Sequence, residues 1–177
     1  MTHVDVRDLV GHPGASRAVH LAEPLVGLAT PMAEVPAEAP LAVDVLLESV
    51  MEGILVSGRV AGPLLLRCAR CLTEFDSDLD VNVRELFAAN PDAEADDYPL
   101  EEDHVNLEPM VRDAVVLELP FSPLCRPDCR GLCERCGGDR NREECACGPD
   151  VDPRWSGLEA LLADLDVPDD EPGPRAG

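Results

Sequence analysis

The stretch 74-EFDSDLDVNVREL-86 has the clearest secondary-structure pattern in the chain. Polar and apolar residues alternate along it, and its main apolar positions are Phe75, Leu79, Val81 and Val83. A period of two predicts a β-strand with one face buried and the other face in water. The stretch therefore predicts a sheet protein, and the neighbouring segments are best interpreted around this strand.

Three runs upstream of this stretch are rich in Val and Leu and are separated by glycine or proline. They are 41-LAVDVLLESV-50, 53-GILVSGRV-60 and 62-GPLLLRCARC-71. Each run is typical of a strand, and the pair Gly62 and Pro63 is interpreted as a break between the last two. Because the connections are short, we expect an antiparallel β-meander.

The N-terminal part of the chain has a different composition. Residues 13–40 end in LATPMAEVPAEAP and combine Pro and Ala with little periodicity. This pattern predicts a loop with at most one short strand. We therefore expect an N-terminal extended or loop segment over 1–40, before an α+β core domain over 41–122.

An amphipathic helix is predicted in 106-NLEPMVRDAVVLELP-120, between Pro109 near its start and Pro120 at its end. Its apolar residues recur at helical spacing: Leu107, Met110, Val111, Ala114, Val115 and Leu117. We expect this face to pack on the sheet, with docking of a partner helix as the alternative. The expected fold class is thus α+β: an antiparallel sheet with one packed helix.

A second, short helix is predicted at the C-terminus, over 151–166. In 152-DPRWSGLEALLADL-165, Asp152 is a good N-cap and Pro153 suits the first helical position. Residues 167–177 are expected to form a disordered tail.

The eight cysteines come in four close pairs: Cys68 with Cys71, Cys125 with Cys129, Cys133 with Cys136, and Cys145 with Cys147. Eight thiols are the number that two tetrahedral tetrathiolate sites require, and two sulfurs on one tight turn reach a single ion at about 2.3 Å. The expected cofactor is therefore zinc, as two structural ions. Disulfides, an iron–sulfur cluster and a redox dithiol are the alternatives, and the reducing cytoplasm disfavours the first.

Two pairings of the cysteines are open. In the favoured one a local zinc knuckle within 123–150 contains Cys133, Cys136, Cys145 and Cys147, because the glycines after Cys136 permit a tight turn. The second site then contains Cys68, Cys71, Cys125 and Cys129. The rival pairing joins Cys125, Cys129, Cys133 and Cys136, and leaves Cys68, Cys71, Cys145 and Cys147.

The net charge of −22 disfavours a surface that binds nucleic acid in general, and it favours a basic partner. The alternative is that the charge serves only solubility. An acidic loop over 90–104 supplies candidate contacts to a basic partner: Asp96, Asp97, Glu101, Glu102 and Asp103. Positive charge concentrates near the cysteines. Seven arginines there are candidates either for contact with RNA or for neutralising thiolates: Arg67, Arg70, Arg126, Arg130, Arg135, Arg140 and Arg142.

The sequence offers no catalytic group that we can assign. No nucleophile has a base nearby, no phosphate-binding loop is present, and four sulfurs around an ion leave no open position for substrate. We therefore expect no enzyme activity and no small-molecule substrate. The chain has no apolar run of about 18–20 residues and does not begin like a secretion signal, so we expect a cytoplasmic protein without a membrane span.

Four features in this order resemble the YceD-like family, the large ribosomal RNA subunit accumulation proteins of bacteria and plastids: CARCL, LELPFSPLCRPDCRGLCERCG, a C-x-C and DPRWSGLEALL. The similarity runs from about Leu41 to Leu165. It implies a role in the accumulation or processing of 23S ribosomal RNA and in assembly of the large subunit, without an established enzyme activity. Some members lack the second cysteine cluster.

The resemblance leaves the direct partner open. The expected partner is the precursor of the large subunit, which the protein would contact through either 23S RNA or a basic ribosomal protein. A chaperone that shields a basic ribosomal protein fits the acidic composition as the alternative, and a zinc-dependent interaction module outside the ribosome is a further one.

Overall fold

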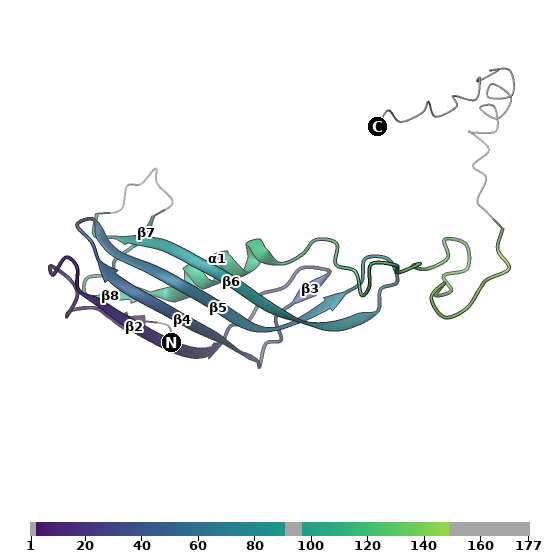
Figure 1. The fold of residues 1–177 in the computed structure, drawn as a ribbon, viewed down its shortest axis with the longest axis horizontal. Coiled ribbons are helices and arrows are strands. Elements are labelled where there is room, and N and C mark those ends of the chain that lie inside the picture. Colours follow the sequence, from purple (N-terminus) through teal and green to yellow (C-terminus); the bar gives the residue numbers. More distant parts are fainter. Residues whose placement is uncertain (1–2, 91–96, 149–177) are drawn as a thin grey trace, which may run out of the picture.

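The structure is a computed structural model that describes residues 3–90 and 97–148. The main sheet has the strand order β2-β4-β5-β6-β7, with β3 paired to β5, and β1 pairs separately with β8 (Figure 1). All pairs are antiparallel except β6 with β7. The elements are β1 His3–Asp5, β2 Ser16–Pro24, β3 Ala33–Glu34, β4 Pro40–Ser49, β5 Gly53–Arg67, β6 Glu74–Ala88, β7 Tyr98–Pro99, β8 His104–Asn106 and α1 Leu107–Glu118.

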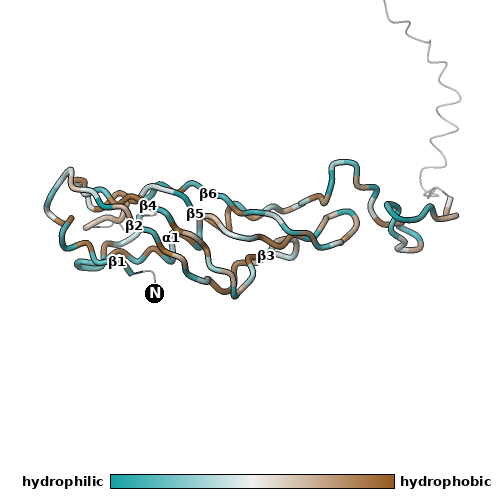
Figure 2. The backbone as a smooth tube through the Cα atoms, turned by 60° about the horizontal axis from the view of Figure 1, so that its bottom comes forward, coloured by the Kyte–Doolittle hydropathy of each residue, from teal (hydrophilic) through white to brown (hydrophobic). Residues whose placement is uncertain are grey.

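The alternation predicted for residues 74–86 is confirmed in β6. Leu79, Val81 and Val83 are buried, whereas Asp80 and Asn82 between them are exposed. The tube in Figure 2 accordingly changes between hydrophilic and hydrophobic colours along the strands. One face of the sheet therefore packs in the core, and the opposite face is in water.

The predicted break at Gly62 and Pro63 is wrong, because β5 continues through both residues as one strand of 15 residues. A Cβ atom at Gly62 would lie 2.5 Å from Cδ2 of Leu41, so this glycine allows close packing instead of a turn. Pairing with β4 ends at Ala61. Pro63 therefore lies beyond the residues that pair with β4, where the missing N–H of proline costs no hydrogen bond to that strand.

The prediction of a loop with at most one short strand over residues 13–40 also differs from the structure. Residues 16–24 form β2, a strand of nine residues that pairs with β4 along its whole length. Ala and Ser hold several of its outer positions, so the contrast between its two faces is weak and the period of two is hidden. Nearby residues also join the core, including Leu25, Leu28 and Val35.

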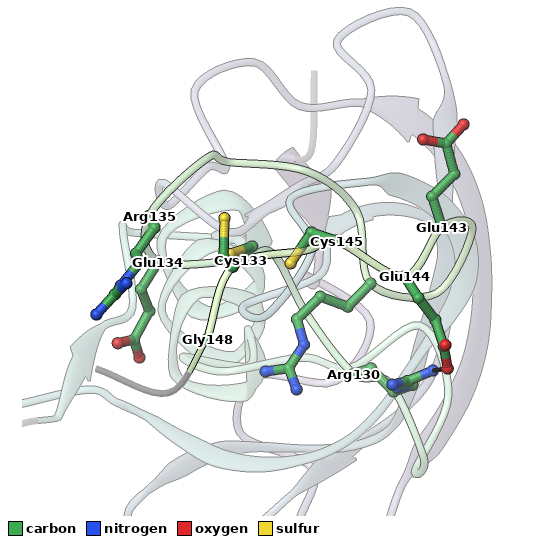
Figure 3. Close-up of a pocket in the computed structure, with 10 residues that line it drawn as sticks. Arg130, Cys133, Glu134, Arg135, Glu143, Glu144, Cys145 and Gly148 are labelled. Carbon is green, nitrogen blue, oxygen red and sulfur yellow. Dashed lines mark ion pairs between the residues drawn. The ribbon is translucent and has the colours of Figure 1, made fainter. Parts of the chain in front are cut away.

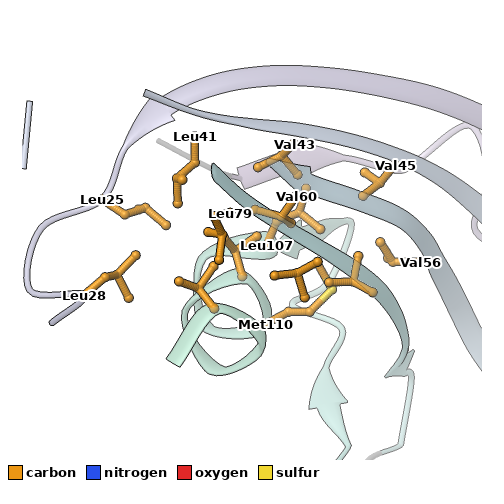
Figure 4. Packing of buried hydrophobic residues seen from close by; sticks show 14 of the residues in the cluster. Leu25, Leu28, Leu41, Val43, Val45, Val56, Val60, Leu79, Leu107 and Met110 are labelled. Carbon is orange, nitrogen blue, oxygen red and sulfur yellow. The ribbon is translucent and has the colours of Figure 1, made fainter. Parts of the chain in front are cut away.

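The predicted helix is confirmed as α1, and it covers the inner face of the sheet (Figure 4). The side chain of Asn106 caps it by accepting a hydrogen bond of 3.2 Å from the N–H of Glu108. Leu107, Met110, Val111 and Val115 are buried, as the spacing predicted. Leu117 is not: it is 84% exposed, because it lies on the opposite side of the helix from Val115.

The β5–β6 hairpin extends beyond the part of the sheet that α1 covers, and the cysteine-rich segment continues outward from its end (Figure 1). No helix among residues 3–90 and 97–148 is long and apolar enough to cross a membrane. The helix predicted over 151–166 and the tail predicted over 167–177 lie outside the described residues.

Candidate metal centres

The eight sulfurs form two groups of four, and within each group all sulfurs lie within 4.8 Å of one another. We call Cys68, Cys71, Cys125 and Cys129 the proximal cluster, and Cys133, Cys136, Cys145 and Cys147 the distal cluster. This grouping is the one that the sequence favoured, and the rival pairing is not found. Each cluster could therefore hold a metal ion.

The proximal cluster begins in the tight turn that joins β5 to β6. The N–H of Leu72 donates to the carbonyl of Cys68 at 2.9 Å, and the N–H of Cys68 donates to the carbonyl of Thr73 at 2.9 Å. Leu72 closes the turn with a φ of 58°, in the left-handed region. The turn points Cys68 and Cys71 inward, and both are buried.

The segment after α1 brings the other two cysteines of this cluster to the turn. The N–H of Ala69 donates to the carbonyl of Pro123 at 2.8 Å, and Nη1 of Arg70 donates to the carbonyl of Cys129 at 2.9 Å. The N–H of Leu132 donates to the carbonyl of Arg70 at 3.0 Å. These bonds hold the post-helix segment against the hairpin, even though Cys71 and Cys125 are 54 residues apart in sequence.

The sulfur separations in the proximal cluster fit a tetrahedral ion. Four sulfurs at about 2.3 Å from one ion lie about 3.8 Å from each other. The Sγ atoms of Cys68 and Cys129 are 3.8 Å apart, and those of Cys71 and Cys125 are 3.7 Å apart. The thiols thus already stand at the spacing of a tetrathiolate site.

Ionisation is uneven within the proximal cluster. Burial opposes ionisation of Cys68, but the backbone N–H groups of Cys125, Cys71 and Arg70 donate to its sulfur and lower its pKa to about 6. Burial and hydrogen bonds to neighbouring sulfurs raise the pKa of Cys125 to about 12. The cluster therefore forms a first thiolate easily and resists the last one, and a divalent cation would offset the accumulated negative charge.

The distal cluster is built on a turn of its own. The N–H of Cys133 donates to the carbonyl of Gly138, and the N–H of Gly137 donates to the carbonyl of Cys133, both at 2.8 Å. Gly137 has a φ of 70°, which glycine adopts without strain. The backbone N–H groups of Cys136 and Arg135 lower the pKa of Cys133 to about 6.

The distal cluster is more open to solvent than the proximal one. Cys136 and Cys147 are exposed, and Cys133 and Cys145 are half-buried. Figure 3 shows Cys133 and Cys145 in the wall of a cavity of about 490 Å³, which charged side chains also line. A metal ion in this cluster would exchange with solvent more readily than one in the proximal cluster.

Asn141 connects the two clusters and was not among the residues predicted from the sequence. Its side chain donates through Nδ2 to Sγ of Cys129 at 3.5 Å, and its Oδ1 accepts from the N–H of Arg130 at 2.7 Å. Nη2 of Arg126 donates to the same oxygen at 2.7 Å. Asn141 lies in the loop between Cys136 and Cys145, so the loop of the distal cluster supplies a hydrogen bond to a ligand of the proximal one. A lone Asn in a loop has no sequence signal for this role.

The arginines proposed for RNA contact largely have partners within the chain. Ion pairs join Arg67 to Glu74 at 2.9 Å, Arg126 to Asp128 at 3.5 Å, Arg130 to Glu144 at 3.7 Å, and Arg142 to Asp139 at 3.5 Å. Arg70 donates to the backbone of the proximal cluster, and Arg135 and Arg140 line the distal cavity. These interactions reduce the positive charge available to RNA.

The acidic candidates lie at the other end of the molecule from the cysteines. Asp97 immediately precedes β7, and Glu101, Glu102 and Asp103 lie between β7 and β8 (Figure 1). Asp97, Glu101 and Glu102 are exposed, and Asp103 is half-buried. Asp96 lies outside the described residues. A partner that touches both groups would have to span the length of the sheet.

The fold and the two clusters define a class: an α+β protein in which two tetracysteine clusters, each able to hold a metal ion, lie at one end of an antiparallel sheet. Residues 56–162 match the family described as large ribosomal RNA subunit accumulation protein YceD, and this range contains all eight cysteines. The chain belongs to the YceD family.

Its relatives come from bacteria and plants. An uncharacterised protein of Mycobacterium tuberculosis (strain ATCC 25618 / H37Rv) is 40% identical over 168 residues, which cover 90% of this chain and 80% of the relative. YlbN of Bacillus subtilis (strain 168) is 31% identical over 108 residues, covering 58% of this chain and 63% of YlbN. The chloroplastic YCED homolog 1 of Arabidopsis thaliana is 33% identical over 51 residues, or 29% of this chain and 16% of the homolog. No solved structure matches the chain.

Proposed function

We propose that the protein is a non-enzymatic factor in large ribosomal subunit biogenesis, which supports accumulation or processing of 23S ribosomal RNA in the cytoplasm. The observation that carries this proposal is the family match, because it covers β6, α1, every cysteine and most of β5. The family's description speaks of large ribosomal RNA subunit accumulation, which favours a role in assembly over one in metabolism.

Zinc is the metal that we propose for both clusters. Tetrathiolate sites with four sulfurs at this spacing are typical of structural zinc, which takes four ligands in a tetrahedron. Such a site has no open position for water or substrate, so we assign the ions a structural role. In the proximal cluster zinc would join the β5–β6 turn to the segment after α1.

A second candidate function is that of an acidic chaperone, which shields a basic ribosomal protein without touching RNA. The ion pairs of Arg67, Arg126, Arg130 and Arg142 favour it, because they leave little free positive charge next to an overall charge of −22. A protein partner with basic segments matches this surface better than phosphate does.

Depletion of the protein in its host tests the proposed function. We expect a lower ratio of mature 23S to 16S RNA and a deficit of large subunits on sucrose gradients, both restored by the wild-type chain. Affinity capture with and without ribonuclease then separates the candidates, because a ribosomal-protein partner survives the nuclease and an RNA-mediated one does not. Normal subunit profiles after depletion would favour an interaction module outside the ribosome.

A further inference from the structure

Residues 74–86 of β6 form an open edge of the main sheet. They pair with β5 on one side, and within the described residues no strand pairs with them on the other. β7 joins β6 only at Phe87 and Ala88. An open edge presents a row of backbone N–H and C=O groups to which another extended chain can hydrogen-bond.

The outer face of this edge is acidic. Glu74, Asp76, Asp78 and Asp80 follow one another at every second position of β6, and all four are exposed. Arg67 and Arg59 pair with the first and the last of them. No interaction within the described residues occupies Asp76 or Asp78, so two uncompensated carboxylates stand on neighbouring outward positions about 7 Å apart.

The inner side of the same edge is apolar, because one flank of α1 is exposed there. Tyr98 of β7 donates its hydroxyl to Oδ2 of Asp113 at 2.9 Å, which places the Asp113 flank of α1 on the side of β6 where β7 pairs, next to the open stretch. Val116 and Leu117 share that flank, three and four residues further along. They are 43% and 84% exposed.

β7 shows how a segment fits this edge. It adds to β6 in parallel, and the ring of Tyr98 points inward, where it stacks on Phe87 at a centroid distance of 5.2 Å and bonds to the helix. β7 contains only two residues, so it covers only one end of this edge of β6. The rest of the edge has no paired strand among the described residues.

We propose that the open edge of β6 binds an extended basic segment of a partner protein as an additional strand. Along such a strand, side chains alternate between the two faces. Its outward residues would be Lys or Arg, opposite Asp76 and Asp78, and its inward residues would be apolar, against Val116 and Leu117. Backbone hydrogen bonds supply affinity, and the alternation of basic and apolar residues supplies selectivity.

This inference names the kind of segment that the chaperone candidate would bind, and in that respect it rests on the proposed function. The surface itself does not depend on the ribosome. The test therefore uses purified protein and synthetic peptides, so that its failure is distinct from a failure of the proposed function. RNA binding at this edge is an outcome that the test can show.

The probe is a nine-residue peptide in which lysine and valine alternate, measured by calorimetry against the full chain. We expect binding that Asp76→Asn with Asp78→Asn weakens by about twofold to thirtyfold, the range that two cross-strand ion pairs contribute. The matched control is Glu38→Gln with Glu52→Gln, which removes the same charge at exposed positions outside β6 and should leave affinity unchanged. Leu117→Gln should also weaken binding, whereas Met51→Gln, at a residue 89% exposed elsewhere, should not.

Two further peptides separate strand addition from simple charge attraction. A peptide of the same composition with its lysines in one block keeps the charge but loses the alternation, and one with methylated backbone nitrogens cannot donate to the edge. Both should bind at least tenfold more weakly. Equal affinity for all three peptides, or loss of affinity in the Glu38 and Glu52 control alone, would overturn the proposal. Tighter binding of an oligouridylate that competes with the peptide would assign the edge to RNA instead.

Discussion

The two cysteine clusters should differ in what they stabilise, and Cys71→Ser compared with Cys136→Ser tests this. Cys71 is a buried cysteine of the proximal cluster, which joins the β5–β6 hairpin to the segment after α1. Cys136 is an exposed cysteine of the distal cluster, whose surroundings belong mostly to the same local loop. We therefore expect the first substitution to destabilise the sheet and the second to affect only the appendage.

The magnitude follows from the coupling of metal binding to folding. A structural zinc site contributes roughly 10–16 kcal/mol of binding free energy. Loss of one ligand in four leaves a weaker three-sulfur site, so we take about a quarter of that, or about 3 kcal/mol. For a chain of this size 1 kcal/mol lowers Tm by about 2–4 °C, which gives a drop of about 6–12 °C for Cys71→Ser. For Cys136→Ser we expect a drop below about 2 °C.

Scanning calorimetry and far-ultraviolet circular dichroism of zinc-loaded protein give both Tm values. A strong chelator provides the control: after metal removal, wild type and Cys71→Ser should melt within about 2 °C of each other. Equal drops for the two variants, or a larger drop for Cys136→Ser, would refute the reasoning. A difference in Tm between wild type and Cys71→Ser that the chelator leaves unchanged would also refute the reasoning.

Other expectations follow from single features. Elemental analysis of the purified chain should find two zinc ions, and less than one equivalent would contradict the metal assignment. Asn141→Ala removes the bond to the sulfur of Cys129 and should lower metal affinity of the proximal cluster about tenfold in a chelator competition, with Asn90→Ala unchanged as the control. Gly58→Ala places a Cβ atom 2.1 Å from the carbonyl oxygen of Asp44, so urea titration should show a loss of about 1–3 kcal/mol, and wild-type stability would contradict the packing. If the partner is a protein, its capture should be unchanged when four arginines are together replaced by Ser: Arg126, Arg130, Arg140 and Arg142. Nanomolar binding of wild type to naked 23S fragments, abolished by the same replacements, would contradict this.

Features that depend on neighbours along the chain were predictable from the sequence. The alternation in residues 74–86 predicted β6, because burial of one face of a strand imposes a period of two. Pro109 and Pro120 predicted the limits of α1, because the missing N–H of proline acts within a few residues. The cysteine pairs likewise showed that metal sites were possible, since each pair lies on one short turn.

Tertiary structure decided what depends on contacts between distant segments. Gly62 was interpreted as a break, but it is a point of close contact with Leu41, and the same residue type serves both purposes. Residues 16–24 form the strand β2 despite their weak alternation, because β4 pairs with them along their whole length. A single strand carries no signal of what will lie beside it.

The cysteines show the same division most clearly. Sequence spacing placed Cys68 beside Cys71 and left two ways to combine the pairs. The hydrogen bonds from Ala69 and Arg70 to the segment after α1 selected one of them, because they bring that segment to the end of the β5–β6 hairpin. Asn141 reaches Cys129 for the same reason. Local chemistry sets which groups can bind a metal, but the path of the backbone through the whole sheet sets which of those groups meet.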